Sequence, residues 1–119
     1  MHNLILRYII KIMAKEKEVL QVHVITKKRI IEAKVAFPES ACSLDGWYRV
    51  ISKNSFHHFA DLKKFFGAVD KVGNLYVFDI GGNKVRLIVS IHFNRQRVYI
   101  RHILSHAAYD KGNWKNMRL

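Results

Sequence analysis

Five residues near the C-terminal end of the chain have types that can bind and cleave a phosphodiester: Arg86, Arg101, His106, Tyr109 and Asp110. Cleaving RNA without a metal ion requires a group that takes the 2′-OH proton, a group that protonates the departing 5′-oxygen, and fixed cations beside the phosphate. His106 and Tyr109 are candidates for the two proton transfers, in either order. The planar guanidinium groups of Arg86 and Arg101 suit a phosphate clamp. Asp110 is expected to orient one of these groups or to cap a short helix.

The same residues have ordinary structural interpretations. A histidine at a strand end is more often a surface or core residue than a catalyst, and Tyr109 and Trp114 could simply anchor the C-terminal tail. His106 is interpreted as catalytic only because Arg101, Tyr109 and Asp110 accompany it.

A second set of residues is expected to contact RNA without taking part in the reaction: Asn83, Lys84, His92, Tyr99, Lys63 and Lys64. Asn83 could hydrogen-bond a base or simply tolerate positive φ, because Gly81-Gly82-Asn83 is typical of a hairpin turn and no helix follows it to make a phosphate cradle. Lys63-Lys64 and Lys27-Lys28-Arg29 are typical of solvated helix faces, although either could contact the RNA backbone.

The charge of the chain favours a polyanionic partner. Its 119 residues include 21 Lys and Arg against 9 Asp and Glu, a formal net charge of +12. RNA or DNA phosphate is therefore the first expected partner, before an anionic membrane surface or an acidic protein. The single cysteine, Cys42, cannot form an intramolecular disulfide, which is typical of a reduced, cytoplasmic protein.

The histidine spacing argues against a metal site. His102 and His106 are four residues apart, which suits zinc on a helix but separates the side chains by about 13 Å on a strand. The few acids are scattered along the chain, which argues against a two-metal nuclease. We therefore expect no metal and no other cofactor.

The length predicts one domain, which we place at residues 19–119. Residues 1–18 are expected to be an N-terminal extension, either disordered or produced by an upstream start codon with true initiation at Met13. Their apolar run resembles an export signal, but Arg7 and Lys11 interrupt it and no small-residue cleavage site follows. We expect neither a signal peptide nor a transmembrane helix.

The period of the apolar residues changes from helical to alternating along the chain. A strand is expected at residues 19–25, followed by helices at 27–35, 44–51 and 58–66. Thr26 is expected to cap the first helix, in which Ile30, Ile31, Lys34 and Val35 fall at helical spacing, and Pro38 to end it. Strands are expected at 68–72, 75–80, 84–93 and 97–104. This order predicts an α+β domain whose N-terminal strand and helices pack on one face of a mostly antiparallel sheet.

Alternation along the last two strands assigns side chains to the two faces of the sheet. Arg86 is expected on the open face, and its alternating neighbours Val85, Leu87 and Val89 under the helices. In the last strand the helix face is expected to take Val98, Ile100, His102 and Leu104, and the open face Tyr99, Arg101, Ile103 and Ser105. The strand must then end or bend near Ser105 if His106, Tyr109 and Asp110 are to reach the same cleft.

Two stretches of this sequence resemble the HigB toxin family of RelE-like messenger-RNA interferases: residues 76–89, with Gly82-Asn83-x-x-Arg86, and residues 98–111, with His106-x-x-Tyr109-Asp110. The resemblance implies a small sheet with N-terminal helices and a metal-independent endoribonuclease that cuts messenger RNA, often on the ribosome. It also implies a helix-turn-helix antitoxin, HigA, as partner. The chain departs from the family pattern at Ser105, where Thr is usual, at Ala108, where Glu is usual, and at Asp79, where Asn is common.

Two functions are compatible with these observations. One is the toxin of a type II toxin–antitoxin module, which cleaves messenger RNA by attack of the 2′-OH and thereby inhibits translation and growth. The other is a non-catalytic RNA- or ribosome-binding module that uses the same basic sheet, and Ala108 in place of the usual Glu keeps this alternative open.

Overall fold

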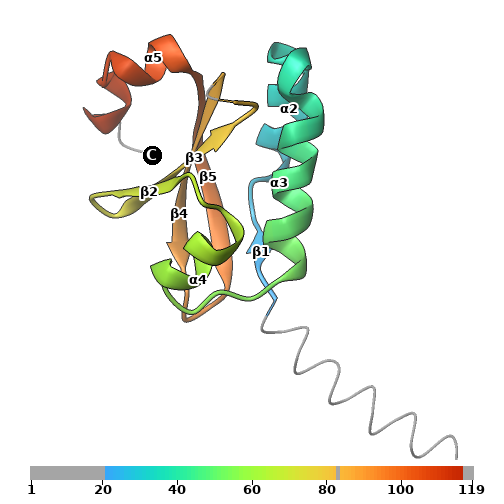
Figure 1. Cartoon of the computed structure of the whole chain (residues 1–119), viewed down its shortest axis with the longest axis vertical. Coiled ribbons are helices and arrows are strands. Elements are labelled where there is room, and N and C mark those ends of the chain that lie inside the picture. Colours follow the sequence, from blue (N-terminus) through green and yellow to red (C-terminus); the bar gives the residue numbers. More distant parts are fainter. Residues whose placement is uncertain (1–20, 83, 117–119) are drawn as a thin grey trace, which may run out of the picture.

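The computed structural model describes residues 21–82 and 84–116 (Figure 1). The expected extension at residues 1–18 and the candidate Asn83 lie outside these residues. The helices are α2 (Lys27–Ala36), α3 (Ala41–Lys53), α4 (Phe59–Phe65) and α5 (His106–Asp110), with 3-10 turns η1 (Pro38–Ser40) and η2 (Asn113–Asn116). The strands are β1 (His23–Val24), β2 (Val69–Val72), β3 (Leu75–Ile80), β4 (Val85–His92) and β5 (Arg97–Ser105).

The five strands form one sheet in the order β1-β5-β4-β3-β2. β1 pairs parallel with β5, and every other neighbouring pair is antiparallel. Figure 1 shows α2 and α3 together on one side of the sheet and α5 on the other. The predicted α+β class, with a mostly antiparallel sheet and N-terminal helices on one face, is therefore confirmed.

The main core lies between the helices and the sheet. α3 contributes Leu44, Trp47 and Ile51, which are buried at the predicted spacing, because residues three and four apart share one side of a helix. The sheet contributes alternate residues of β4 and β5, which include Val85, Leu87, Val89, Val98 and Ile100. A smaller cluster on the opposite face holds Val77, Ile88 and Trp114. No helix in the described residues is long and apolar enough to cross a membrane.

The predicted apolar stripe of the first helix is only partly correct. Ile30 and Ala33 of α2 are buried, whereas Ile31 and Val35 are exposed. Thr26 is at the N-cap position but makes no capping bond. Its hydroxyl instead accepts from the backbone N–H of Ile100 at 2.6 Å and donates to that residue's carbonyl at 3.4 Å, so it continues the edge pairing of β5 after β1 ends.

A β-bulge corrects the faces predicted for the end of β5. Ile88 of β4 pairs with His102, but the next residue, Val89, pairs with Ile100, so Arg101 is an extra residue. His102 and Leu104, expected under the helices, therefore lie opposite Ile88 and Arg86 on the other face. Ile103 and Ser105, expected beside Arg86, pair instead with Leu87 and Val85. One extra residue reverses the alternation, which a strict period of two cannot show.

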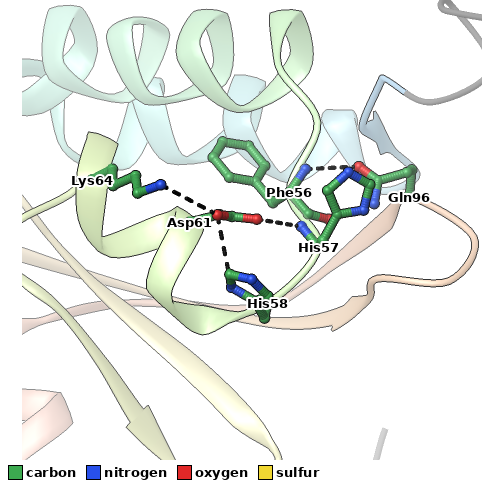
Figure 2. Close-up of polar contacts among 6 residues, drawn as sticks. All are labelled: Phe56, His57, His58, Asp61, Lys64 and Gln96. Carbon is green, nitrogen blue, oxygen red and sulfur yellow. Dashed lines mark hydrogen bonds and ion pairs between the residues drawn. The ribbon is translucent and has the colours of Figure 1, made fainter.

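The turn between β4 and β5 is fixed to the connection before α4, as Figure 2 shows. Gln96 is buried with φ 53, and its side chain accepts a hydrogen bond from the N–H of Phe56 at 3.0 Å. Its amide donates to the carbonyls of Phe56 and Phe93. These bonds satisfy polar groups that would otherwise be buried without partners, so they hold the end of the hairpin on the core.

The start of α4 is stabilised by Asp61, also drawn in Figure 2. Its carboxylate accepts from the N–H of His57 at 2.9 Å, and His58 Nδ1 and Lys64 Nζ lie 3.7 and 3.9 Å from it. The hydrogen bond from His57 is the main cause that lowers the pKa of Asp61 below 3.8. The positive charges of His58 and Lys64 add to this effect, and burial opposes it.

We expect Asp61→Asn to destabilise the protein at neutral pH, and the difference from wild type to disappear in acid. The folded pKa lies below the unfolded value near 3.8, so ionised Asp61 stabilises the fold above that pH. This stabilisation is lost as the pH falls through the folded pKa. Urea unfolding of both proteins at a series of pH values measures the difference. A difference in the free energy of unfolding between the two proteins that stays constant into acid would contradict this role for Asp61.

The turn between β3 and β4 rests against η1 at Gly81. Gly81 has φ 63, and a Cβ placed there would lie 2.8 Å from Ser40 Oγ. We expect Gly81→Ala to lower the free energy of unfolding by about 2 kcal/mol or more, because left-handed backbone strain adds to this clash. Gly46→Ala is the matched control, since Gly46 lies within α3 with open space around it and alanine favours helix by about 0.5–1 kcal/mol. The midpoint of chemical denaturation should therefore fall for Gly81→Ala and rise for Gly46→Ala.

Candidate active site

The end of β5 and the start of α5 make the bend that the site requires. β5 ends at Ser105, and α5 begins at His106. The Ser105 hydroxyl accepts from the N–H of Ala108 at 3.2 Å, which is an N-cap, and the N–H of His106 donates to the carbonyl of Lys84 at 3.2 Å. The predicted change of direction near Ser105 is confirmed. Ser105 stands where the family that the sequence resembles usually has Thr, and its hydroxyl serves here as the helix cap.

Arg86 is the centre of the cluster beneath α5. Its side chain is mostly buried, and its Nε lies 2.9 Å from Oδ1 of Asp79, its partner across the β3–β4 ladder. Its guanidinium carbon is 5.4 Å from the centre of the Tyr109 ring, a cation–π contact. Tyr109 in turn stacks on Trp114, with ring centres 5.2 Å apart and planes 17° from parallel. The Tyr109 ring therefore links Arg86 of the sheet to Trp114 of the C-terminal tail.

The protonation of Tyr109 follows from its surroundings. Burial raises its pKa above 10.0, the neighbouring Arg86 lowers it, and the carboxylates of Asp70, Asp79 and Asp110 raise it. The net direction is upward, so the phenol keeps its proton at neutral pH. In that state Tyr109 is a hydrogen-bond and proton donor, not a base.

His106 and Asp110 occupy the exposed side of α5. His106 Nε2 lies 3.3 Å from Oδ2 of Asp110, one helical turn further on. Both side chains are more than half exposed, so a substrate can reach them. The carboxylate lies where it can accept a hydrogen bond from the imidazole and hold the ring in this orientation. The orienting role predicted for Asp110 stays a prediction, and this pair gives it the partner that the role requires.

Arg101 belongs to a second group further along β5. Its Nε donates to Ser90 Oγ at 3.1 Å, and its guanidinium carbon lies 5.5 Å from the centre of the Tyr99 ring. The Tyr99 ring contacts His92 edge to face, with centres 5.4 Å apart. Because Ser90 and His92 alternate with Arg86 along β4, this group shares the Arg86 face. Ser105 is four positions beyond Arg101, about 13 Å along a strand.

The remaining candidates for RNA contact, three lysines, lie in two different parts of the structure. Lys84 Nζ lies 3.1 Å from Glu39 Oε2, close to the start of β4 and therefore to α5. Lys63 and Lys64 are on α4, whose Leu62 packs into the main core on the other side of the sheet. The structure therefore places His92 and Tyr99 with Arg101, places Lys84 near the start of α5, and brings Lys63 and Lys64 to neither group.

Sequence reasoning missed three partners of the site residues. Ser90 accepts from Arg101, Asp79 pairs with Arg86, and Arg29 donates to the carbonyl of Arg101. The sequence did hold a signal for Asp79, because a turn at Gly81-Gly82 places it opposite Arg86. Among residues 21–82 and 84–116, no three His, Cys, Asp or Glu side chains gather where they could hold a metal ion.

This arrangement of helices on a five-stranded, mostly antiparallel sheet is consistent with the α+β fold of RelE-like proteins. The chain belongs to the HigB toxin family: the family model described as the RelE-like toxic component of a toxin–antitoxin system matches residues 40–112. That match runs from η1 through α5 and so includes the whole Arg86, Tyr109 and His106 cluster.

Relatives of known name cover most of the chain. It is 35% identical over 92 residues to the mRNA interferase HigB of Escherichia coli O6:H1, a match that spans 75% of this chain and 89% of the relative. It is 33% identical over 91 residues to the mRNA interferase toxin HigB of Escherichia coli K12, spanning 74% and 88% of the two chains. The mRNA interferase HigB of Shigella flexneri matches to the same extent.

Proposed function

We propose that this protein is the toxin of a type II toxin–antitoxin module and cleaves messenger RNA in the cytoplasm without a metal ion. We further propose that its substrate is messenger RNA on the ribosome and that a HigA-like helix-turn-helix antitoxin neutralises it. The named activity of its relatives supports the reaction class. The observation that carries the proposal is the mostly buried Arg86 guanidinium against Tyr109, beside the exposed His106–Asp110 pair.

In the proposed reaction the 2′-oxygen attacks the adjacent phosphorus. The 2′-OH proton passes to a base, the bond from phosphorus to the 5′-oxygen breaks, and the 5′-oxygen takes up a proton. The products are a 2′,3′-cyclic phosphate and a 5′-hydroxyl. Because the phenol of Tyr109 stays protonated at neutral pH, His106 is the better base and Tyr109 the better donor.

The cations supply the electrostatic part of this mechanism. Negative charge builds up on the non-bridging oxygens as phosphorus becomes five-coordinate, and fixed guanidinium groups stabilise it most where water is excluded. Arg86 fits this role because its side chain is mostly buried and held in place by Asp79 and Tyr109. Arg101, held by Ser90 on the same face, is assigned to the same strand of RNA.

A second candidate function is a non-catalytic RNA- or ribosome-binding module. The ion pair between Asp79 and Arg86 favours it, because the carboxylate reduces the charge that Arg86 offers to a phosphate. Ala108 also provides no carboxylate on α5, at a position where the HigB family usually has Glu.

One assay separates the two functions. The purified protein is mixed with free messenger RNA, in magnesium buffer and in EDTA, and with messenger RNA on ribosomes in magnesium buffer that keeps them assembled, and the fragments are analysed for their ends. We expect cleavage with 2′,3′-cyclic or 3′-phosphate ends. RNA that is bound but remains intact in all reactions would replace the nuclease proposal with the binding module, and cleavage of free RNA in magnesium buffer but not in EDTA would exclude the metal-free mechanism.

A further inference from the structure

A groove of about 680 Å³ lies between α2 and the outer edge of β5. Lys28, Arg29 and Glu32 of α2 line one side, and Arg101, His102 and Leu104 of β5 line the other. It forms there because β1 pairs only with Arg97 and Val98 of β5. The bonds from Thr26 and Arg29 cover Ile100 and Arg101, and the groove continues along the edge beyond them.

The charges in the groove are not balanced. Arg29 Nη1 donates to the carbonyl of Arg101, and Arg101 Nε donates to the hydroxyl of Ser90, so both guanidinium groups bond neutral acceptors. Glu32 is the only acid among the described residues that line the groove. It lies 3.9 Å from Lys28 in an exposed pair, which is a weak interaction. The lining therefore keeps an excess of positive charge.

The start of α2 adds to this positive field. No acidic residue occupies its first turn, and the Thr26 side chain bonds the backbone of Ile100 instead of the helix. The positive end of the helix dipole is consequently left without the side-chain oxygen or carboxylate that commonly neutralises it. Thr26, Lys28 and Arg29 all line the groove, so this end of the helix opens onto it.

The pKa of His102 is sensitive to the same positive charges. Burial lowers its pKa below 6.5, and the charges of Arg29 and Arg101 lower it further. An anion bound between the two guanidinium groups would offset their effect and raise the pKa of His102. The imidazole ring also offers a flat surface at the edge of the Arg86 face, since His102 pairs with Ile88 of β4.

We infer that this groove binds a phosphate of the RNA strand outside the scissile linkage, with Arg29 as its principal contact. This inference rests on the proposed function for the identity of the ligand as RNA. Arg101 connects the two regions, because it lines the groove and its Nε also donates to Ser90 on the face that carries Arg86. A strand that leaves the site across β5 therefore meets the excess positive charge of the groove.

The test measures binding to the full-length protein without cleavage. A fluorescein-labelled 2′-O-methyl RNA oligonucleotide cannot supply the attacking 2′-OH, and its anisotropy gives the affinity over a range of salt concentrations. We expect Arg29→Ala to weaken binding about five- to tenfold near 0.1 M salt. We also expect it to make the slope of log K against log salt less negative by about 0.7, the value for one lost phosphate contact on a single strand.

Arg49→Ala is the matched control, because Arg49 is exposed on α3 and does not line the groove. Both changes remove one arginine from a helix, where alanine is well tolerated. Circular dichroism checks that each variant folds. As a second readout, the oligonucleotide should raise the pKa of His102 in an NMR titration of wild type, and less so in Arg29→Ala.

The outcomes separate this inference from the proposed function. Equal binding by both variants, with no change at His102, would overturn the inference even if the protein cleaves RNA. Binding that depends on Arg29, in a protein that leaves RNA intact, would sustain the inference and remove the nuclease proposal alone. If Arg29→Ala weakened binding of poly-glutamate but not of the oligonucleotide, the groove would belong to an acidic protein and the inference would fail.

Discussion

His106→Ala is expected to lower the rate constant of RNA cleavage by about 10²–10⁴-fold, the usual contribution of a positioned acid or base. His106 lies on the exposed side of α5, held by Asp110. Its removal should leave RNA binding almost unchanged, because Arg86 and Arg101 remain. Single-turnover cleavage of a short RNA, with anisotropy for binding, measures the two quantities separately. Growth arrest caused by expression of the protein should disappear as well.

The control for this variant is His23→Ala. His23 is an exposed residue of β1, at the edge of the sheet, and so tests the loss of an imidazole elsewhere. Asp110→Asn supplies a second comparison, because it keeps the shape of the side chain but removes the charge that holds His106. We expect it to reduce cleavage less than His106→Ala does. Full cleavage by His106→Ala would transfer the role of base to another group and contradict the assignment.

The sequence predicts the fold well where one face of an element is covered. α3 follows its apolar stripe because its inner side rests on the core. β4 places Val85, Leu87 and Val89 in the main core as expected, because that face meets the helices, but the other face is also covered from Arg86 to Ile88. α2 packs against α3 and the edge of β5, and only Ile30 and Ala33 of it are buried, so Ile31 and Val35 satisfy the helical period yet remain exposed. Periodicity predicts the element there but not how much of it is buried.

The candidate site depends more strongly on tertiary structure. The cap at Ser105 and the contact between Arg86 and Tyr109 follow from motifs that are close in the sequence or across one hairpin. The bulge at Arg101 has no such signal, because it depends on how two strands align over their whole length. The groove beside α2 was missed for a related reason, since Arg29 and Arg101 meet there across more than seventy residues of sequence.

We expect Arg86→Ala to reduce cleavage by about 10²–10³-fold, the effect of removing one preorganised donor from a developing negative charge. Arg86→Lys should recover only part of this loss. Lysine keeps the charge but has neither the planar fork for two phosphate oxygens nor the flat face that lies against Tyr109. Arg49→Lys, on the exposed side of α3, controls for the exchange itself. Cleavage kinetics at saturating RNA distinguish lost catalysis from lost binding.

Arg86→Ala should also lower the free energy of unfolding by about 2 kcal/mol, because it removes the cation–π contact and leaves Asp79 without its ion-pair partner. The double variant Asp79→Asn with Arg86→Ala removes both charges, so we expect it to regain part of this stability but none of the activity. Denaturant unfolding and cleavage of all four members of the cycle separate the two effects. If activity returned together with stability, Arg86 would be a structural residue, and the clamp on the phosphate would have to come from Arg101.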